Sequence, residues 1–230
     1  MSELSVLWAL IRATWGERLS RPLVGILVVV FCASKVLAAS LTHELDDPSF
    51  YLTLLFAAGT VGRDVSSGVL PVLFTRPIAR STYVFAKWLA AGTAAGTIGA
   101  LTIVVQALLL SHRGADVAGS AIAASIFGGF TSAFGISSVL VCFSVFLSGI
   151  GDIALWGGLI LVGKLSVRYV PQRVADEWGA LLHPALDWGA ASGSHLVTAF
   201  QVVSYLSTVS LFLCLAVMAA NRKEISYAAG

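Results

Sequence analysis

The sequence has little charge for its length. Only 11% of its 230 residues are Asp, Glu, Lys or Arg, whereas 57% are hydrophobic and the mean hydropathy is +0.89. Soluble globular domains are about one-quarter charged, so this composition excludes an ordinary soluble domain and is typical of a membrane protein. We therefore expect one transmembrane domain over residues 1–230.

Basic clusters and cysteine motifs are also lacking. No run of five or more Lys and Arg residues occurs and the formal net charge is only +2, so nucleic acid is not an expected partner. The three cysteines, Cys32, Cys142 and Cys214, lie singly in apolar segments, and the four histidines show no ligand spacing. We expect no disulfide framework, no metal and no cofactor bound by this chain.

The first 21 residues lack the basic start and unbroken apolar stretch of a cleavable signal peptide. Their apolar side chains instead recur every three or four residues, at Leu4, Leu7, Trp8, Ile11, Trp15 and Leu19. Arginines and glutamates occupy other faces of the same helix. This pattern predicts an amphipathic helix over 1–21 that lies in the membrane interface. A cytosolic helix packed on protein is the alternative.

Hydrophobic segments predict six transmembrane helices. A helix needs roughly 20 apolar residues to cross the ~30 Å hydrocarbon layer. Four segments reach that length comfortably, namely 22–41, 83–110, 121–147 and 196–220. Two further segments, 50–66 and 153–167, are shorter, and the first must tilt little and let Arg63 reach the interface. The expected fold class is therefore all-α, a polytopic membrane protein with six transmembrane helices.

The basic residues orient the chain. With an inside N-terminus, nine of the 14 Lys and Arg residues fall in or beside cytoplasmic segments, namely Arg12, Arg18, Arg21, Arg63, Arg76, Arg80, Lys87, Arg222 and Lys223. The other five fall outside or near the outer end of a helix, namely Lys35, Arg113, Lys164, Arg168 and Arg173. Cytoplasmic loops carry an excess of Lys and Arg, so we expect both termini in the cytoplasm and the chain in the cell (inner) membrane.

The expected external loop over 168–195 is long and amphipathic. Its apolar residues are Val174, Trp178, Leu181, Leu182, Leu186 and Trp188. They predict one or two helices that rest on the outer surface and are broken at Pro184. Trp178 and Trp188 suit an external gate or a simple interfacial anchor, and the preference of tryptophan for the interface favours the anchor.

The expected spans hold almost no ionisable groups, which disfavours an intramembrane enzyme. Asp152 lies next to a turn, Lys35 can reach outward, and Gln106 is the clear polar amide in mid-span. Gln106 suits the lining of a pathway or, more simply, a contact between helices. Residues 158–165 nearly match a phosphate-binding loop, but Leu165 replaces the hydroxyl that holds magnesium. Any ATP chemistry is therefore expected on another chain.

Arginines, an aspartate and prolines interrupt the apolar sequence between residues 62 and 83. Pro71 is tolerated in a first helical turn, and Pro77 pushes the residue before it out of the helical region. We therefore expect a short helix within 68–80 that carries apolar residues and is edged by Arg63, Arg76 and Arg80. Such a helix suits a groove on a soluble partner or, equally, the surface of anionic membrane lipid.

This stretch resembles the signature of ABC-type-2 exporter permeases. In that family an acidic residue precedes a pattern close to G-T-L-x-x-L-L-x-x-P-[IVL]-x-R, and a lysine opens the third helix. The matching residues here are Asp64, Gly68, Leu70, Leu73, Phe74, Pro77, Ile78, Arg80 and Lys87. Val69 stands where threonine is usual. The resemblance extends to the interfacial first helix, the six spans, the long loop before the sixth span and the short basic end.

The resemblance implies the permease subunit of an ATP-driven exporter. Two permease chains, identical or homologous, would associate with two cytosolic ABC ATPase subunits that bind the ATP and Mg. The segment 68–80 would be the coupling helix, begun by Gly68 and ended by Pro77. Its polar contacts would be Arg63, Asp64, Arg76 and Arg80, and its anchors Leu70, Leu73 and Phe74. This chain would then be a transport subunit and not an enzyme.

Other functions stay open from the residues alone. A non-transporting membrane anchor or sensor of an ATPase-linked complex conflicts with no residue, whereas a lipid-modifying enzyme lacks the acid and base groups it needs. If the chain does transport, its apolar spans favour an amphiphile, a lipid-linked molecule or a drug over a small hydrophilic ion.

Overall fold

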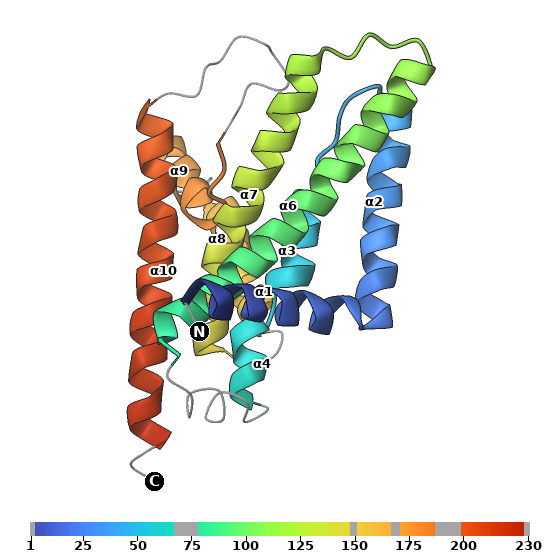
Figure 1. Ribbon diagram of the computed structural model, residues 1–230. Coiled ribbons are helices and arrows are strands. Elements are labelled where there is room, and N and C mark those ends of the chain that lie inside the picture. Colours follow the sequence, from blue (N-terminus) through green and yellow to red (C-terminus); the bar gives the residue numbers. More distant parts are fainter. Residues whose placement is uncertain (1–2, 67–77, 148–150, 167–170, 187–198, 228–230) are drawn as a thin grey trace.

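The computed structural model describes residues 3–66, 78–147, 151–166, 171–186 and 199–227. Within these ranges the chain forms helices and no strand, as the all-α expectation requires (Figure 1). Several residues singled out from the sequence lie outside the described ranges, namely Gly68, Leu70, Leu73, Phe74, Arg76, Pro77 and Trp188. The coupling-helix expectation over 68–80 therefore stays a prediction.

Four helices are long and apolar enough to cross a membrane, as expected of a multi-pass membrane protein. They are α2 (Pro22–Thr42), α6 (Arg80–His112), α7 (Gly119–Phe146) and α10 (Ala199–Tyr227). These helices coincide with the four segments of the sequence that are long enough to cross a membrane. Their ends differ from the expected ends by about three residues or fewer. The exception is the last helix, which continues beyond the expected end at Ala220.

The two shorter segments form shorter helices. The expectation of one helix over 50–66 is wrong in detail, because the chain forms α3 (Ser49–Ala57) and α4 (Thr60–Ser66) with a break between them. The segment 153–167 appears as α8 (Gly151–Ser166), whose 16 residues measure about 24 Å. That length is less than the ~30 Å hydrocarbon layer, so six crossings stay a prediction.

The first helix, α1 (Glu3–Leu19), lies across the long helices near the end of the bundle that carries α4 (Figure 1). Ile11 is buried in a small cluster with Ala86 and Ala90 of α6, and the Trp15 indole donates to the Ala90 carbonyl at 2.8 Å. Trp8 is 58% exposed on another face. The helix therefore packs on protein along one face and presents apolar surface on another.

Helices α6 and α7 form the centre of the bundle and pack through small residues. A Cβ atom added at Gly92 or Gly96 of α6 would collide with the ring of Phe134 or Phe130 of α7. Ser49, the first residue of α3, lies equally close to Gly99 of α6. The glycines of α6 thus set how closely α3 and α7 approach it.

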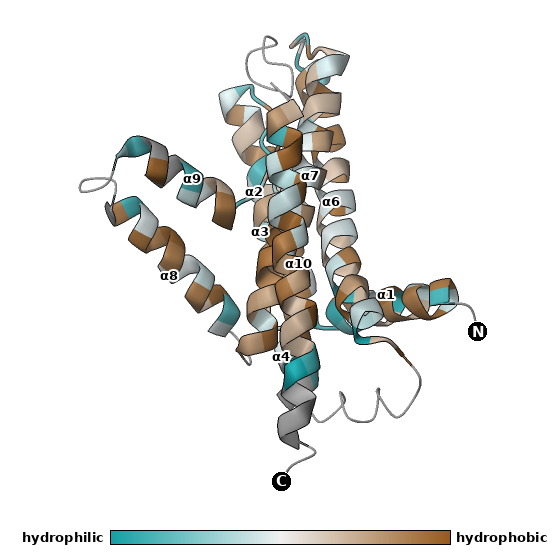
Figure 2. Ribbon diagram, turned by 90° about the vertical axis from the view of Figure 1, so that its left-hand side faces the viewer, coloured by the Kyte–Doolittle hydropathy of each residue, from teal (hydrophilic) through white to brown (hydrophobic). Residues whose placement is uncertain are grey.

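Helices α8 and α9 (Gln172–Leu182) lie side by side and project from the main bundle (Figure 2). The Trp178 indole packs on Gly163 of α8 and donates to the Leu159 carbonyl at 3.0 Å. The chain after α9 returns to the middle of α7, where the His183 and Ser132 side chains lie 3.1 Å apart. The expected loop helix exists, but its end is buried in the bundle and does not merely rest on a surface.

Candidate functional site

Helix α4 is the point where charged side chains gather in this apolar molecule. It lies at one end of the bundle, at the bottom of Figure 1, directly before residues 67–77, which the structure does not describe. Helices α1, α6, α7 and α8 contribute side chains to it. The α4 polar cluster consists of Glu17, Arg18, Arg63, Asp64, Tyr83, Lys87, Ser144 and Asp152.

The cluster begins at the break between α3 and α4. Ala58 leaves the helical region with ψ 128°, and Gly59 has φ 62°. That left-handed conformation favours glycine, which has no Cβ atom to clash. A break of this kind leaves the last carbonyls of one helix and the first amides of the next without partners inside the helices. Side chains from other helices supply these partners here.

Arg18 of α1 satisfies the carbonyl side of the break. Its guanidinium donates to the Leu55 carbonyl at 3.4 Å and to the Ala58 carbonyl. Arg18 is only 5% exposed, and this burial, together with the nearby Arg63, lowers its pKa to about 10. The side chain remains protonated at neutral pH and places a cation at the C-terminal end of α3, where the helix dipole favours one.

Asp152 and Ser144 satisfy the amide side. The Asp152 carboxylate of α8 is fully buried and accepts the Gly59 N–H at 2.5 Å. The Ser144 hydroxyl oxygen of α7 accepts the N–H groups of Val61 and Gly62 at 3.0 and 2.9 Å. An anion and a hydroxyl thus meet the N-terminal amides of α4. Three helices hold the break, and one of them belongs to the projecting α8–α9 pair.

The other end of α4 is held by a buried ion pair. Lys87 Nζ of α6 lies 2.8 Å from a carboxylate oxygen of Asp64, and the Tyr83 hydroxyl donates to the same oxygen at 2.5 Å. The two charged side chains are 7% and 15% exposed. Asp64 and Lys87 are two of the residues that carry the family resemblance, and the fold brings them into contact. Removing one partner of such a pair strands a buried charge.

The rim of the cluster is more exposed. Arg63 lies 3.4 Å from Glu17 of α1, which also pairs with Arg21 at 2.8 Å. Arg80, at the start of α6, donates to the Asn221 carbonyl of α10 at 3.1 Å. Arg63, Asp64 and Arg80 are the described members of the expected coupling set. Each of them is bound to a different helix of the bundle.

Five members of the cluster are not among the functional residues that the sequence predicts, namely Glu17, Arg18, Tyr83, Ser144 and Asp152. The sequence places Arg18 among the expected cytoplasmic arginines and Asp152 next to a turn. Both are buried. The available signal was the rarity of charge itself, since an ionisable group beside an apolar span is usually paired or functional. Both side chains bond backbone groups at the break at Gly59, and no sequence pattern predicts that break.

The remaining sequence candidates lie elsewhere. The Gln106 side chain is 1% exposed and pairs with the Asp46 backbone, donating to its carbonyl at 2.8 Å and accepting its N–H at 2.9 Å. Its partner is thus the loop that leads into α3 and not a neighbouring helix, as the expected helix contact would require. Trp178 fixes α9 to α8, as described above.

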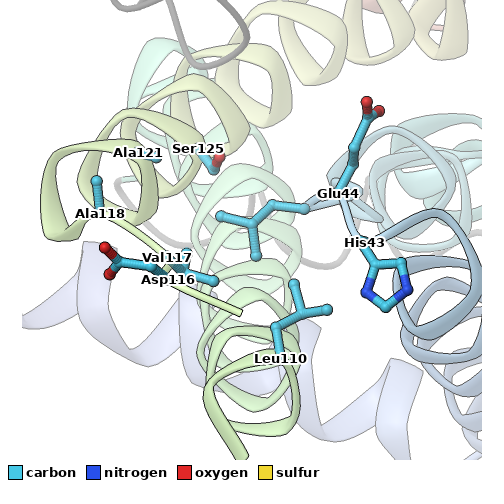
Figure 3. A pocket seen from close by; sticks show the side chains of 9 residues that line it. His43, Glu44, Leu110, Asp116, Val117, Ala118, Ala121 and Ser125 are labelled. Atoms are coloured by element: carbon cyan, nitrogen blue, oxygen red, sulfur yellow. The ribbon is translucent and has the colours of Figure 1, made fainter. Parts of the chain in front are cut away.

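A pocket of about 400 Å³ lies at the opposite end of the bundle from α4 and is lined by the ends of α2, α6 and α7 (Figure 3). Its carboxylates, Glu44 and Asp116, lie on opposite sides of the hollow and do not converge. In the part of the chain that the structure describes, no group of three or more His, Cys, Asp or Glu residues is placed to hold a metal ion. The α4 polar cluster is thus the better candidate.

Comparison with known proteins adds no identification. No protein-family model matches the chain, and no curated protein matches it. The function is therefore inferred from the residues of the α4 polar cluster and from their position in the helix bundle.

Proposed function

We propose that this chain is the membrane-spanning permease subunit of an ATP-driven ABC exporter. It forms the translocation path as a dimer and couples to separate cytosolic ATPase subunits. The observation that carries the proposal is the buried Asp64–Lys87 pair at 2.8 Å, which joins two residues of the family-like signature directly before residues 67–77. That segment is the proposed contact with the ATPase.

The proposal assigns sides and crossings to the helices. The α4 end of the bundle faces the cytoplasm together with both termini, and α1 lies in the membrane interface. The chain crosses six times, with the broken α3–α4 pair as the second crossing and α8 as the fifth. The exposed apolar side chains of α1, such as Leu4 and Trp8, support the interfacial position.

The contacts of α4 supply a physical route for coupling. Its first amides are bound to Asp152 of α8 and Ser144 of α7, and Asp64 near its other end is bound to α6. A push on the segment that follows α4 therefore reaches three helices through charged or hydrogen-bonded contacts. We propose that α4 moves relative to α3 at the break at Gly59, where the two helices are not continuous.

The experiment is purification of the tagged chain in mild detergent, followed by identification of the co-purifying proteins and measurement of their ATPase activity. We expect a soluble ATPase with a Walker motif. Phe74→Asp should abolish the stimulation of its activity while membrane insertion stays intact, and the matched control Phe74→Leu should keep the stimulation. Unchanged coupled activity in Phe74→Asp removes the coupling role of the 68–80 segment.

Transport is tested separately from coupling. Vesicles that contain the complex should accumulate or release an amphiphilic substrate only with ATP, and the substrate should change the ATPase rate. A complex that hydrolyses ATP without any flux would instead be the non-transporting anchor or sensor.

A further inference from the structure

A pocket of about 540 Å³ lies between α9 and α10, in the half of the molecule away from α4. Its volume falls within the range of about 300–1,000 Å³ that drug-sized ligands occupy. The pocket lies outside the α4 polar cluster and shares none of its residues. It is also separate from Gln106 and from the acidic pocket of Figure 3.

Apart from Phe200, the α10 wall of this pocket consists of residues with polar groups, although α10 is long and apolar enough to cross a membrane. Gln201, Ser204, Tyr205 and Thr208 line the pocket, and their three-and-four spacing places them on one face of the helix. Polar side chains in a membrane helix usually face the protein interior or a cavity that binds polar groups. This face meets a cavity, which suggests that its hydroxyl groups serve a ligand.

The opposite wall is apolar with a carboxylate at one edge. Leu181 and Pro184 line it, and Glu177 contributes the charged group among the described lining residues. The two walls thus differ in chemistry. One offers hydrogen bonds, the other an apolar surface and a negative charge.

Both walls are fixed to α7, so the pocket is formed in advance of any ligand. On the α10 side, the Tyr205 hydroxyl donates to the Thr131 carbonyl at 2.9 Å. On the α9 side, His183 contacts Ser132 of α7 at 3.1 Å, and the Trp156 indole of α8 donates to the Leu182 carbonyl at 2.8 Å. A pocket whose walls are already held in place loses less conformational freedom when a ligand binds.

The surroundings of the pocket indicate how a ligand arrives. Val203 and Leu206 of α10 are exposed and apolar, as expected of a helix face that meets lipid. A molecule with an apolar body can therefore reach the polar face of α10 from the bilayer.

From this arrangement we propose that the α9–α10 pocket binds a cationic amphiphile. Its apolar body lies against Leu181 and Pro184, its head lies near the Glu177 carboxylate, and Ser204 and Thr208 donate hydrogen bonds to a carbonyl or ether oxygen that the ligand carries beside its apolar body. As a statement about the transported substrate class, this proposal rests on the proposed permease function. As a statement about binding, it is independent of that function.

The test uses the full chain, purified without any ATPase, and a dodecyltrimethylammonium probe that carries a benzophenone group. We expect photolabelling of peptides from α9 and α10, and about threefold weaker binding for Glu177→Gln, because solvent screens a charge contact made by an exposed carboxylate. An uncharged benzophenone probe with the same alkyl chain should bind Glu177→Gln and the original chain equally.

Ser204→Leu removes a hydroxyl and places a larger side chain in the pocket, so it should weaken the binding of both probes. Ser207→Leu is the matched control, because Ser207 is an exposed α10 serine that does not line the pocket, and it should change nothing. Thermal unfolding of each variant checks that the fold is kept. Equal labelling in Ser204→Leu and Ser207→Leu, or labelling spread over the exposed face of α2, shows plain partitioning into detergent or lipid and overturns the proposal. Specific binding by a chain that recruits no ATPase would keep the site and remove only the permease assignment.

Discussion

The α4 polar cluster and the α9–α10 pocket use polar groups in opposite ways. In the cluster, the buried charges bind protein partners: Arg18 binds carbonyls of α3, Asp152 binds an amide at the break, and Asp64 binds Lys87. In the pocket, Ser204 and Thr208 line open volume on a helix that is long and apolar enough to cross a membrane. Polar groups that hold the fold are thus bonded to other protein groups, whereas polar groups available to a ligand line a pocket.

This contrast assigns different tasks to the two regions. Buried charge pairs hold geometry because separating them is costly in a medium of low dielectric constant. A pocket with fixed walls and unfilled volume instead supports reversible binding. Under the proposed function, the cluster transmits movement and the pocket meets the substrate.

The largest effect is expected for Asp152→Ala. The Gly59 N–H would lose its buried acceptor, and buried Arg18 would lose a nearby anion. We expect the free energy of unfolding to fall by about 3 kcal/mol, measured by equilibrium unfolding in mixed micelles with SDS. Asp116→Ala removes an exposed carboxylate and should be nearly neutral. Equal losses in the two variants would show that the contact with Gly59 does not hold the break.

The next effect is expected for the Asp64–Lys87 pair. Lys87→Met should lower the free energy of unfolding by about 2 kcal/mol, because Asp64 keeps Tyr83 but loses its buried cation. The double variant with Asp64→Asn should cost less than the sum of the two single variants. Lys164→Met, at an exposed lysine of α8, is the control. Strict additivity in the cycle would mean that the two charges do not interact.

A smaller effect is expected for a change in α8, the helix that carries Asp152 of the cluster and packs on α9 of the pocket. Gly163→Val places a side chain where the Trp178 ring lies and should displace α9 from α8. Overpacking of this kind costs about 1 kcal/mol or more, and the probe should bind the α9–α10 pocket several-fold more weakly. Gly157→Val is on the same helix, where an added Cβ meets nothing, and should leave binding unchanged. If both variants bind the probe equally, α8 does not position the pocket wall.

The long helices could be predicted from the sequence because length and apolar composition decide them. The segments 22–41, 83–110, 121–147 and 196–220 all reappear as membrane-length helices. The Gly59 break could not be predicted in the same way. Thr60, Val61 and the residues before Gly59 continue an apolar run, and the helix ends there because Arg18, Asp152 and Ser144 arrive from distant parts of the chain.

The candidate site was predicted in part. Asp64 and Lys87 were both singled out through the family resemblance, but their contact depends on the relative rotation of α4 and α6, which no local pattern encodes. The α9–α10 pocket was missed altogether. The sequence contains the three-and-four spacing of four α10 residues, Gln201, Ser204, Tyr205 and Thr208. Only the position of α9 shows that this face of α10 lines a pocket.

The smallest effect is expected at the rim of the cluster, for Glu17→Gln. Glu17 pairs with Arg21 and Arg63 and is also an anion near buried Arg18, but the Glu17, Arg21 and Arg63 side chains are at least one-third exposed, and Arg18 keeps its carbonyl partners. Solvent and salt screen such pairs, so the free energy of unfolding should change by less than about 0.5 kcal/mol, and raising the salt concentration should remove the difference. Glu3→Gln is the control, because Glu3 lies on the same helix and takes part in none of the ion pairs described above. A loss at Glu17 as large as that of Lys87→Met would mean that position around α4, and not burial, determines which charges hold the helix.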